Sequence, residues 1–228
     1  MSSEPSGLVS VRRTCLLAGL AGIAGFLMLG ESFHINNGPP LSAPDGVFLA
    51  YVTANARRVM VAAWLQAVGP ALIIVFALTL VSLSMAQRRV AGLLTVFGAG
   101  VLMTVSLMEV ACYIAQLYTT PPQMPRIANT FGYAIQHLYF FVAAPALFLP
   151  LGCVLLRSSV LPRIFAWLAL LLGAGFVGLG ILYMQALVLP AGVTAFAGVQ
   201  SLWWLAAAIA LMVRARRVAK AMEGPSAA

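Results

Sequence analysis

Long apolar stretches alternate with short polar segments along almost the whole chain. Each stretch is at or near the roughly 20 residues that an α-helix needs to cross the hydrocarbon core of a membrane. The stretches show no alternation with a period of two, and backbone groups in lipid must bond within their own segment, so helices are predicted rather than strands. The sequence therefore predicts an all-α membrane protein, a bundle of six transmembrane helices over about residues 14–33, 59–85, 90–118, 131–156, 164–189 and 191–213.

Composition supports this prediction. Of the 228 residues, 62% are hydrophobic and only 8% are charged, and a water-soluble domain could not bury that much apolar surface. We expect a single transmembrane domain over residues 12–217 between two cytoplasmic tails, 1–11 and 218–228, whose ends are small and polar. No small-residue cleavage site follows the first stretch, so we interpret it as a span and not as a cleaved signal.

The positive charges predict the orientation of the bundle. The formal net charge is +8, and the cations lie at helix ends, which argues against a nucleic-acid partner. By the positive-inside rule, both termini are expected in the cytoplasm, with the protein as a multi-pass component of the bacterial cytoplasmic (inner) membrane. The inner side holds Arg12, Arg13, Arg88, Arg89, Arg157, Arg163, Arg214, Arg216, Arg217 and Lys220, and the outer side holds Arg57, Arg58 and Arg126.

Two outer connections have distinct predicted structures. In the segment 31–58, Ser42 is placed to cap a helix and Pro44 to lie in its first turn, which predicts a short amphipathic helix before the second span. The segment 119–130 contains three prolines, which predict a stiff and extended connection.

Prolines and glycines inside the spans predict kinks and close helix packing. Pro70, Pro145 and Pro150 should bend the second and fourth spans. Small residues let helix backbones approach each other in a membrane. This role is expected for Gly98, Gly100, Gly173, Gly175, Gly178 and Gly180.

A shift of 75 residues aligns the second and third stretches with the fourth and fifth without gaps. Pro70 then meets Pro145, and Arg88 meets Arg163. The coincidence predicts an internal duplication of a helical hairpin, with both copies running in the same direction. The alternative is chance similarity between spans rich in Leu, Ala and Gly.

Polar residues within the spans point to a candidate site. Glu109 is the only carboxylate deep in an apolar stretch, and an ionised side chain at the bilayer centre costs roughly 2.5 to 3.5 kcal/mol even on lenient scales. Helical spacing places it on one stripe that should face the bundle interior. The other members of this stripe are Ser106, Cys112, Tyr113 and Gln116.

Most of the remaining polar residues lie in the outer halves of their spans. This asymmetry predicts an outward-facing polar pocket closed on the inner side by apolar residues. Gln185 belongs to the same outer half, and a tryptophan near Gln200 could present its indole N–H to a ligand, with core packing as the alternative. The predicted ligand-binding residues are Glu109, His137, Gln66, Tyr113, Gln116, Gln136, Gln200 and Trp203.

Three functions remain open for this cluster. In the first, a protonated Glu109 binds or helps to transport a small amphipathic or protonatable ligand. In the second, Glu31, His34, Glu109 and His137 hold a metal or haem in a redox enzyme, since Glu31 and His34 are one helical turn apart. In the third, the cluster only joins helices by hydrogen bonds in a structural or accessory subunit. No catalytic signature favours an enzyme, and the cofactor and oligomeric state are left open.

Several loop and helix-end segments resemble a known group of proteins. These segments are Ala-Asn-Ala-Arg-Arg-Val at 54–59, Leu-Arg-Ser-Ser-Val-Leu-Pro-Arg at 156–163 and the following Ala166-Trp167, together with Glu109 in the third span. In this order they resemble uncharacterised bacterial six-span membrane proteins assigned to a domain of unknown function. The resemblance implies the six-span topology and a bacterial membrane, and it implies no activity.

Overall fold

The structure is a computed structural model that describes residues 6–184 and 190–222. Its regular elements are all helical, and six helical units in the described part are long and apolar enough to cross a membrane. The predicted all-α bundle of six helices is confirmed. The elements are α1 (Ser6–Ile35), α2 (Asp45–Leu83), α3 (Val90–Ala115), α4 (Met124–Leu138), the π-helical turn η1 (Tyr139–Ala143), α5 (Ala144–Leu156), α6 (Arg163–Met184) and α7 (Pro190–Met222).

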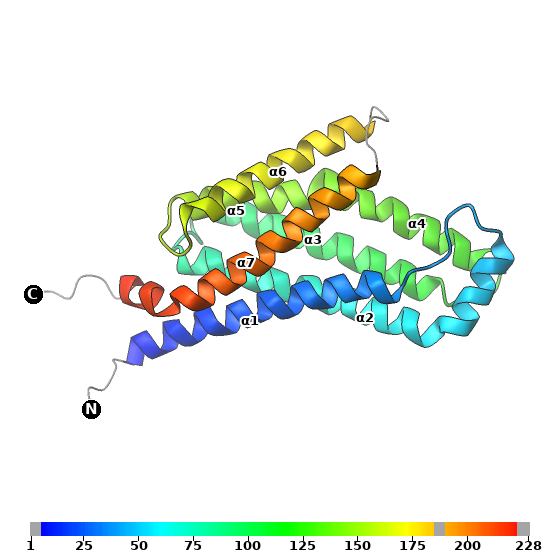
Figure 1. The fold of residues 1–228 in the computed structure, drawn as a ribbon, viewed down its shortest axis with the longest axis horizontal. Coiled ribbons are helices and arrows are strands. Elements are labelled where there is room, and N and C mark those ends of the chain that lie inside the picture. Colours follow the sequence, from blue (N-terminus) through cyan, green and yellow to red (C-terminus); the bar gives the residue numbers. More distant parts are fainter. Residues whose placement is uncertain (1–5, 185–189, 223–228) are drawn as a thin grey trace, which may run out of the picture.

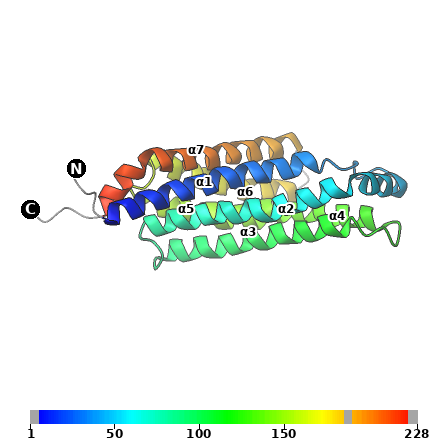
Figure 2. The same cartoon turned by 90° about the horizontal axis from the view of Figure 1, so that it is seen from below.

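The long helices run side by side, and α4, η1 and α5 together form the fourth span (Figures 1 and 2). Helix α1 packs between α2 and α7, and α3 packs against α2, α4 and α5. Helix α6 packs mainly against α5. The start of α1 and the end of α7 lie at the same end of the bundle (Figure 1), as an even number of spans requires.

The outside of the bundle is apolar. Large hydrophobic side chains are exposed on the long helices, among them Leu20 on α1, Trp64 on α2, Phe97 on α3 and Leu171 on α6. Exposed apolar surface on this scale is unfavourable in water and is what hydrocarbon contact requires. Together with the six apolar helices, this surface identifies an integral, multi-pass membrane protein in contact with the lipid bilayer.

Aromatic side chains fill the core between α5, α6 and α7. The rings of Phe148 and Trp204 lie 5.1 Å apart, and those of Trp203 and Trp204 lie 4.8 Å apart, measured between centroids. The Trp203 indole N–H donates to the carbonyl oxygen of Phe165 at 3.0 Å. This cluster ties α5, α6 and α7 together.

Glycines mark the closest helix contacts. A Cβ atom on Gly98 would lie 2.1 Å from the carbonyl oxygen of Ala146, so α3 and α5 touch backbone to backbone at this point. Added Cβ atoms at Gly173, Gly175 and Gly180 would also meet neighbouring helices within 3 Å. The prediction is wrong for Gly100 and Gly178, where a Cβ atom would meet nothing within 4 Å.

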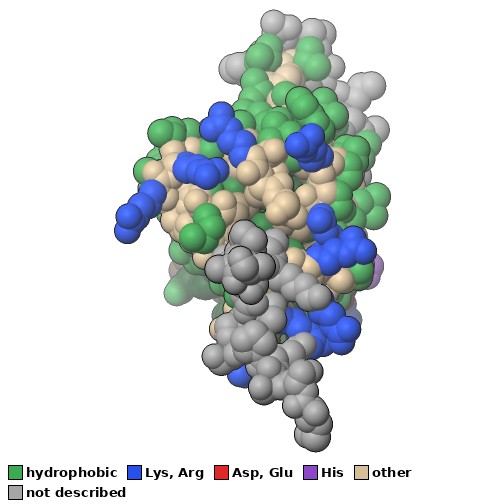
Figure 3. All heavy atoms as spheres, turned by 90° about the vertical axis from the view of Figure 1, so that its left-hand side faces the viewer, with side chains coloured by type: hydrophobic (Ala, Val, Ile, Leu, Met, Phe, Trp, Pro, Cys, Tyr) green, Lys and Arg blue, Asp and Glu red, His purple; other side chains and the backbone are tan. Residues whose placement is uncertain are grey.

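The cationic side chains gather on the end of the bundle that holds both termini (Figure 3). Figure 3 shows no Asp or Glu side chain among the residues that it colours on this face. Exposed arginines at this end include Arg13, Arg88, Arg89, Arg157, Arg163, Arg216 and Arg217. The structure therefore agrees with the charge asymmetry that the sequence predicted.

Both outer connections are shorter than predicted. Helix α1 continues to Ile35, and α2 begins at Asp45 with Pro44 as its N-cap, so Ser42 is not the cap. The segment 119–130 is not extended throughout, because α4 already begins at Met124 with proline in its first turn. Proline is favoured there, since the first turn of a helix needs no N–H donor.

Two irregularities interrupt the long helices. The only non-helical dihedral angles inside α2 belong to Asn55, not to Pro70, and the Asn55 side-chain amide donates to the Tyr51 carbonyl at 2.9 Å. Figure 1 shows the first turns of α2 set at an angle to the rest of the helix. In the fourth span, η1 lies directly before Ala144 and Pro145, where proline cannot continue the ladder of α-helical hydrogen bonds.

The chain ends differ in part from the predicted tails. Helix α1 begins at Ser6 and α7 ends at Met222, so helices extend into both segments. Residues 223–228 and Gln185 lie outside the described residues. The hairpin duplication stays a prediction.

Candidate functional site

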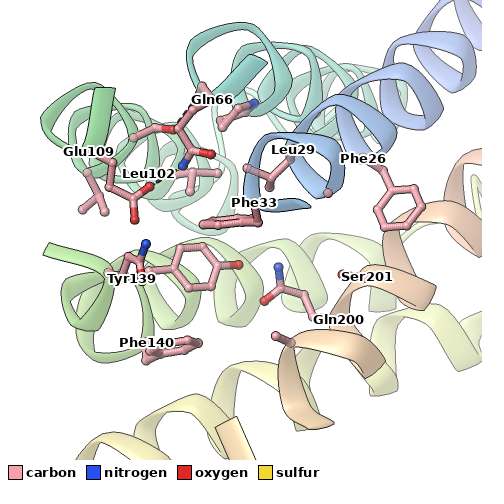
Figure 4. A pocket seen from close by; sticks show the side chains of 16 residues that line it. Phe26, Leu29, Phe33, Gln66, Leu102, Glu109, Tyr139, Phe140, Gln200 and Ser201 are labelled. Carbon is pink, nitrogen blue, oxygen red and sulfur yellow. Dashed lines mark hydrogen bonds between the residues drawn. The ribbon is translucent and has the colours of Figure 1, made fainter. Parts of the chain in front are cut away.

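A cavity of about 270 Å³ lies among α1, α2, α3, the α4–η1 junction and α7 (Figure 4). Its walls are mostly apolar and aromatic, with polar groups on two sides. The apolar lining includes Phe26, Leu29, Phe33, Leu102, Val105 and Phe140, and the polar lining consists of Gln66, Ser106, Glu109, Gln136, Tyr139, Gln200 and Ser201. Apolar walls with a few convergent polar groups are typical of small-molecule sites.

A chain of buried hydrogen bonds forms one side of the cavity. The Ser32 hydroxyl donates to Gln66 Oε1 at 2.7 Å, and Gln66 Nε2 donates to Glu109 Oε2. The Ser106 hydroxyl donates to the Gln66 backbone carbonyl at 2.9 Å. All four residues are buried. The chain therefore joins α1, α2 and α3 and fixes the orientation of the Gln66 amide.

Gln66 satisfies one oxygen of Glu109 and leaves the other facing the cavity. In Figure 4 the Glu109 carboxyl group points from α3 toward the side of the cavity occupied by Tyr139. A carboxyl group held by one amide and surrounded by Leu102 and other apolar side chains is poorly solvated. It is thus prepared to interact with a polar or cationic group that enters the cavity.

Tyr139 and Gln200 form the opposite side. Their side chains point toward each other (Figure 4). Gln200 is 8% exposed, and its Oε1 has no hydrogen-bond partner among the described residues. A buried acceptor without a donor destabilises a protein by about 1 to 3 kcal/mol. Gln200 Oε1 is therefore an unsatisfied acceptor on a residue that lines the cavity.

The π-helical turn places Tyr139 in this wall. The Ala144 N–H donates to the Tyr139 carbonyl, a bond across five residues and not four. Such turns occur frequently at functional sites. The Tyr139 ring is held by edge contacts with Phe140 and Phe176, at centroid distances of 5.5 and 5.9 Å. The tyrosine hydroxyl is thus positioned by backbone geometry and by aromatic packing.

The structure brings four predicted site residues, Gln66, Glu109, Gln136 and Gln200, to one cavity. Two others lie on α3 toward its outer end, outside the lining. Tyr113 packs with Val59, Ala62 and Ala63 of α2, and Gln116 Nε2 donates to Asn129 Oδ1 on α4 at 3.4 Å. These two residues join α3 to α2 and to α4.

Two further predicted residues, His137 and Trp203, do not line the cavity. His137 Nδ1 lies 2.7 Å from the Tyr133 carbonyl, one turn earlier on α4. The indole N–H of Trp203 is bonded to Phe165 on α6. Trp203 therefore has the role of core packing, the alternative to contact with a ligand.

The predicted metal-binding set is not brought together. Glu31 and His34 are exposed near the outer end of α1, whereas Glu109 is buried in the cavity. No group of three or more His, Cys, Asp or Glu residues that could hold a metal ion is found in the described ranges 6–184 and 190–222. Sequence spacing relates Glu31 to His34 on one helix, but it does not say how far these two residues lie from residues on other helices. The predicted set of four therefore could not be tested by spacing alone.

Several residues of the site carry no signal in the sequence. Ser201 lines the cavity and Ser32 supports it through its hydrogen bond to Gln66, and both are single serines in apolar helices. Tyr139 depends on the π turn. Phe26, Leu29 and Phe33 lie on one face of α1 at helical spacing, a signal that the uniformly apolar sequence conceals.

Comparison with known proteins adds no relative. No protein-family model matches the chain, nor does any curated protein or any solved structure. The resemblance to six-span proteins of unknown function therefore stays a prediction, and the candidate site rests on its geometry.

Proposed function

We propose that this protein binds a small amphipathic ligand with a protonatable amine in the cavity between Glu109 and Gln200. One observation carries the proposal. Glu109 and Gln200 line the same largely apolar cavity, and Gln200 Oε1 has no hydrogen-bond partner among the described residues. Both groups accept hydrogen bonds, and an ammonium group has only donors.

The walls fit the remainder of such a ligand. Phe26, Phe33 and Phe140 provide aromatic surface for a short hydrocarbon chain, and aromatic faces also attract a cation. The volume of about 270 Å³ lies just below the about 300 to 1,000 Å³ of typical ligand pockets. The ligand is therefore small.

Access from the membrane is consistent with an amphipathic ligand. Gly30 and Phe33 line the cavity and are also exposed at the outer part of α1, so the mouth lies beside them. Below the cavity, the buried cluster around Phe148, Trp203 and Trp204 closes the bundle. Binding from the outer side is supported more strongly than a continuous channel, and transport would require the helices to rearrange.

A titration with alkyl amines and matched alkyl alcohols tests the proposal. For purified protein in phosphatidylcholine nanodiscs, we expect Glu109→Gln to weaken amine binding about tenfold or more, since a charge-assisted hydrogen bond becomes a neutral one. Alcohol binding should change little, because the amide still accepts a hydrogen bond. Calorimetry or intact-mass spectrometry measures both affinities.

Glu31→Gln is the matched control, since it makes the same substitution at an exposed position of α1. This variant should bind the amines like the parent. Equal amine affinities for Glu109→Gln, Glu31→Gln and the parent would contradict the proposal.

A structural or accessory role is the second candidate, favoured by the buried hydrogen-bond chain across α1, α2 and α3. Gln200→Leu separates the two roles. It removes the unpartnered acceptor but no bond of that chain. If the protein binds amines, the parent should bind them and Gln200→Leu should bind them more weakly. If the role is purely structural, neither the parent nor the variant should bind amines.

The cellular location belongs to the same proposal. The arginine-rich end with both termini faces the cytoplasm, and the membrane is the cytoplasmic membrane of a bacterium. The positive-inside rule supports the orientation, and the resemblance of segments 54–59 and 156–163 supports the bacterial source. Accessibility labelling of single cysteines at the two ends of the bundle in intact cells tests the orientation.

A further inference from the structure

A second hollow lies at the arginine-rich end, separate from the Glu109 cavity. Its volume is about 430 Å³, and it is formed by the end of α2, the connection after α5 and the last turns of α7. Its lining residues are Leu83, Ser84, Met85, Arg157, Ser158, Ser159, Val160, Arg214, Arg217 and Val218.

Three arginines give this hollow a strong positive charge. Arg214 Nη2 donates to the Ser159 carbonyl at 3.2 Å, which orients its guanidinium group, and Arg157 and Arg217 are exposed. Across residues 6–184 and 190–222, the only ion pair joins Arg126 and Asp45. The three guanidinium groups therefore have no carboxylate partner in the described part of the chain.

A buried hydroxyl completes the hollow. Ser84 is 9% exposed, and its Oγ has no hydrogen-bond partner among the described residues. The nearby carbonyls at the end of α2 are already bonded: Met85 N–H donates to Ser82 at 2.9 Å, and Ala86 N–H donates to Val81 at 3.1 Å. Met85 adopts the left-handed conformation, with φ of 50°, that this type of helix end requires. Ser84 thus lines the same hollow as the three arginines and carries a hydroxyl that lacks a partner among the described residues.

From these contacts we infer that the hollow binds the phosphate group of an anionic membrane lipid. Guanidinium groups bind phosphate oxygens in a paired geometry, and Ser84 supplies a further donor. The site lies at helix ends, where basic pockets between membrane helices hold lipid head groups. Leu83, Met85, Val160 and Val218 form the apolar part of the lining that the glycerol and upper acyl chains contact.

Lipid retention by the full chain tests this inference. Nanodiscs of phosphatidylcholine with a small fraction of phosphatidylglycerol provide the probe, and intact-mass spectrometry counts the lipid that remains bound. Replacing two arginines, Arg157→Gln with Arg217→Gln, should weaken phosphatidylglycerol retention about tenfold to thirtyfold. Arg214 is kept, because it also bonds to the backbone.

The matched control is Arg88→Gln with Arg89→Gln, which removes the same charge from the same end of the bundle but outside the hollow. It should change retention less than twofold. An equal loss in both double variants would overturn the inference, because the lipid would then respond only to net charge.

Two further measurements cover folding and the source of the phosphate. Ser84→Ala keeps every charge and should weaken phosphatidylglycerol retention about threefold. Retention that is unchanged both in this variant and in the Arg157 and Arg217 double variant would overturn the site. This conclusion holds even if one of the variants unfolds at a lower temperature than the parent. Inorganic phosphate at millimolar concentration is added both to lipid-free protein in neutral detergent and to the protein in nanodiscs. If it raises the melting temperature of the lipid-free protein in an arginine-dependent way and releases phosphatidylglycerol from the nanodisc protein, a soluble phosphate is the ligand and the lipid assignment is wrong.

Discussion

Gly98→Ala is expected to lower the free energy of unfolding by about 3 kcal/mol. The added Cβ atom would lie 2.1 Å from the Ala146 carbonyl oxygen, 2.4 Å from its carbon and 2.7 Å from the Leu147 nitrogen. These are backbone atoms and cannot rotate away as a side chain would. Helices α3 and α5 must therefore separate, which loosens the packing of Leu147 and Phe148 in the core. Thermal and denaturant unfolding in lipid nanodiscs measures the loss.

Gly100→Ala provides a control on the same helix. A Cβ atom at Gly100 would meet no heavy atom within 4 Å, and alanine favours helix by up to about 1 kcal/mol over glycine. We expect stability that is unchanged or slightly higher. If Gly98→Ala and Gly100→Ala proved equally stable, the direct backbone contact between α3 and α5 would be excluded.

Gln66→Leu is expected to lower the free energy of unfolding by about 2 kcal/mol. Leucine fills a similar volume but cannot bond to Ser32 or to Glu109. The mutation therefore leaves a hydroxyl and a carboxyl group buried without their partners. The exposed Gln123 gives the control Gln123→Leu, for which we expect no measurable change.

A double-mutant cycle separates the network from simple volume effects. Gln66→Leu lowers the free energy of unfolding mainly because it leaves the buried Glu109 carboxyl group without its partner. Adding Glu109→Leu should therefore recover part of the lost stability. The double variant is thus expected to be less destabilised than the sum of the single variants. Strict additivity would mean that the hydrogen bond from Gln66 to Glu109 contributes nothing to folding.

The number and type of helices could be predicted because lipid allows few alternatives. Each apolar stretch is long enough to span the hydrocarbon core, and a span in lipid must be helical. The burial of Ser106, Glu109, Tyr113 and Gln116 was predictable as well, since a polar stripe at helical spacing must avoid lipid.

The inward faces of the other helices could not be predicted in the same way. A helix that is apolar all round gives no signal of which face points to the core. The sequence therefore gives no reason to exclude Trp203 from the cavity, although it bonds to Phe165. It also does not separate Gly100 from Gly98, although two residues apart on a helix point in nearly opposite directions. The pairing of Tyr139 with Gln200 depends on a change of helix type that hydropathy does not register.

The π turn at Tyr139–Ala143 also makes the two halves of the fourth span rotationally independent. One residue corresponds to about 100° of rotation on a helix. Loss of a single residue from this turn would restore a regular α-helix and turn α4 relative to α5, which would carry Gln136 away from the cavity. The packing of Phe148 and Leu151 on α5 would be unaffected. Insertions and deletions at this turn thus offer a route by which related chains could change ligand while they keep the same inner core.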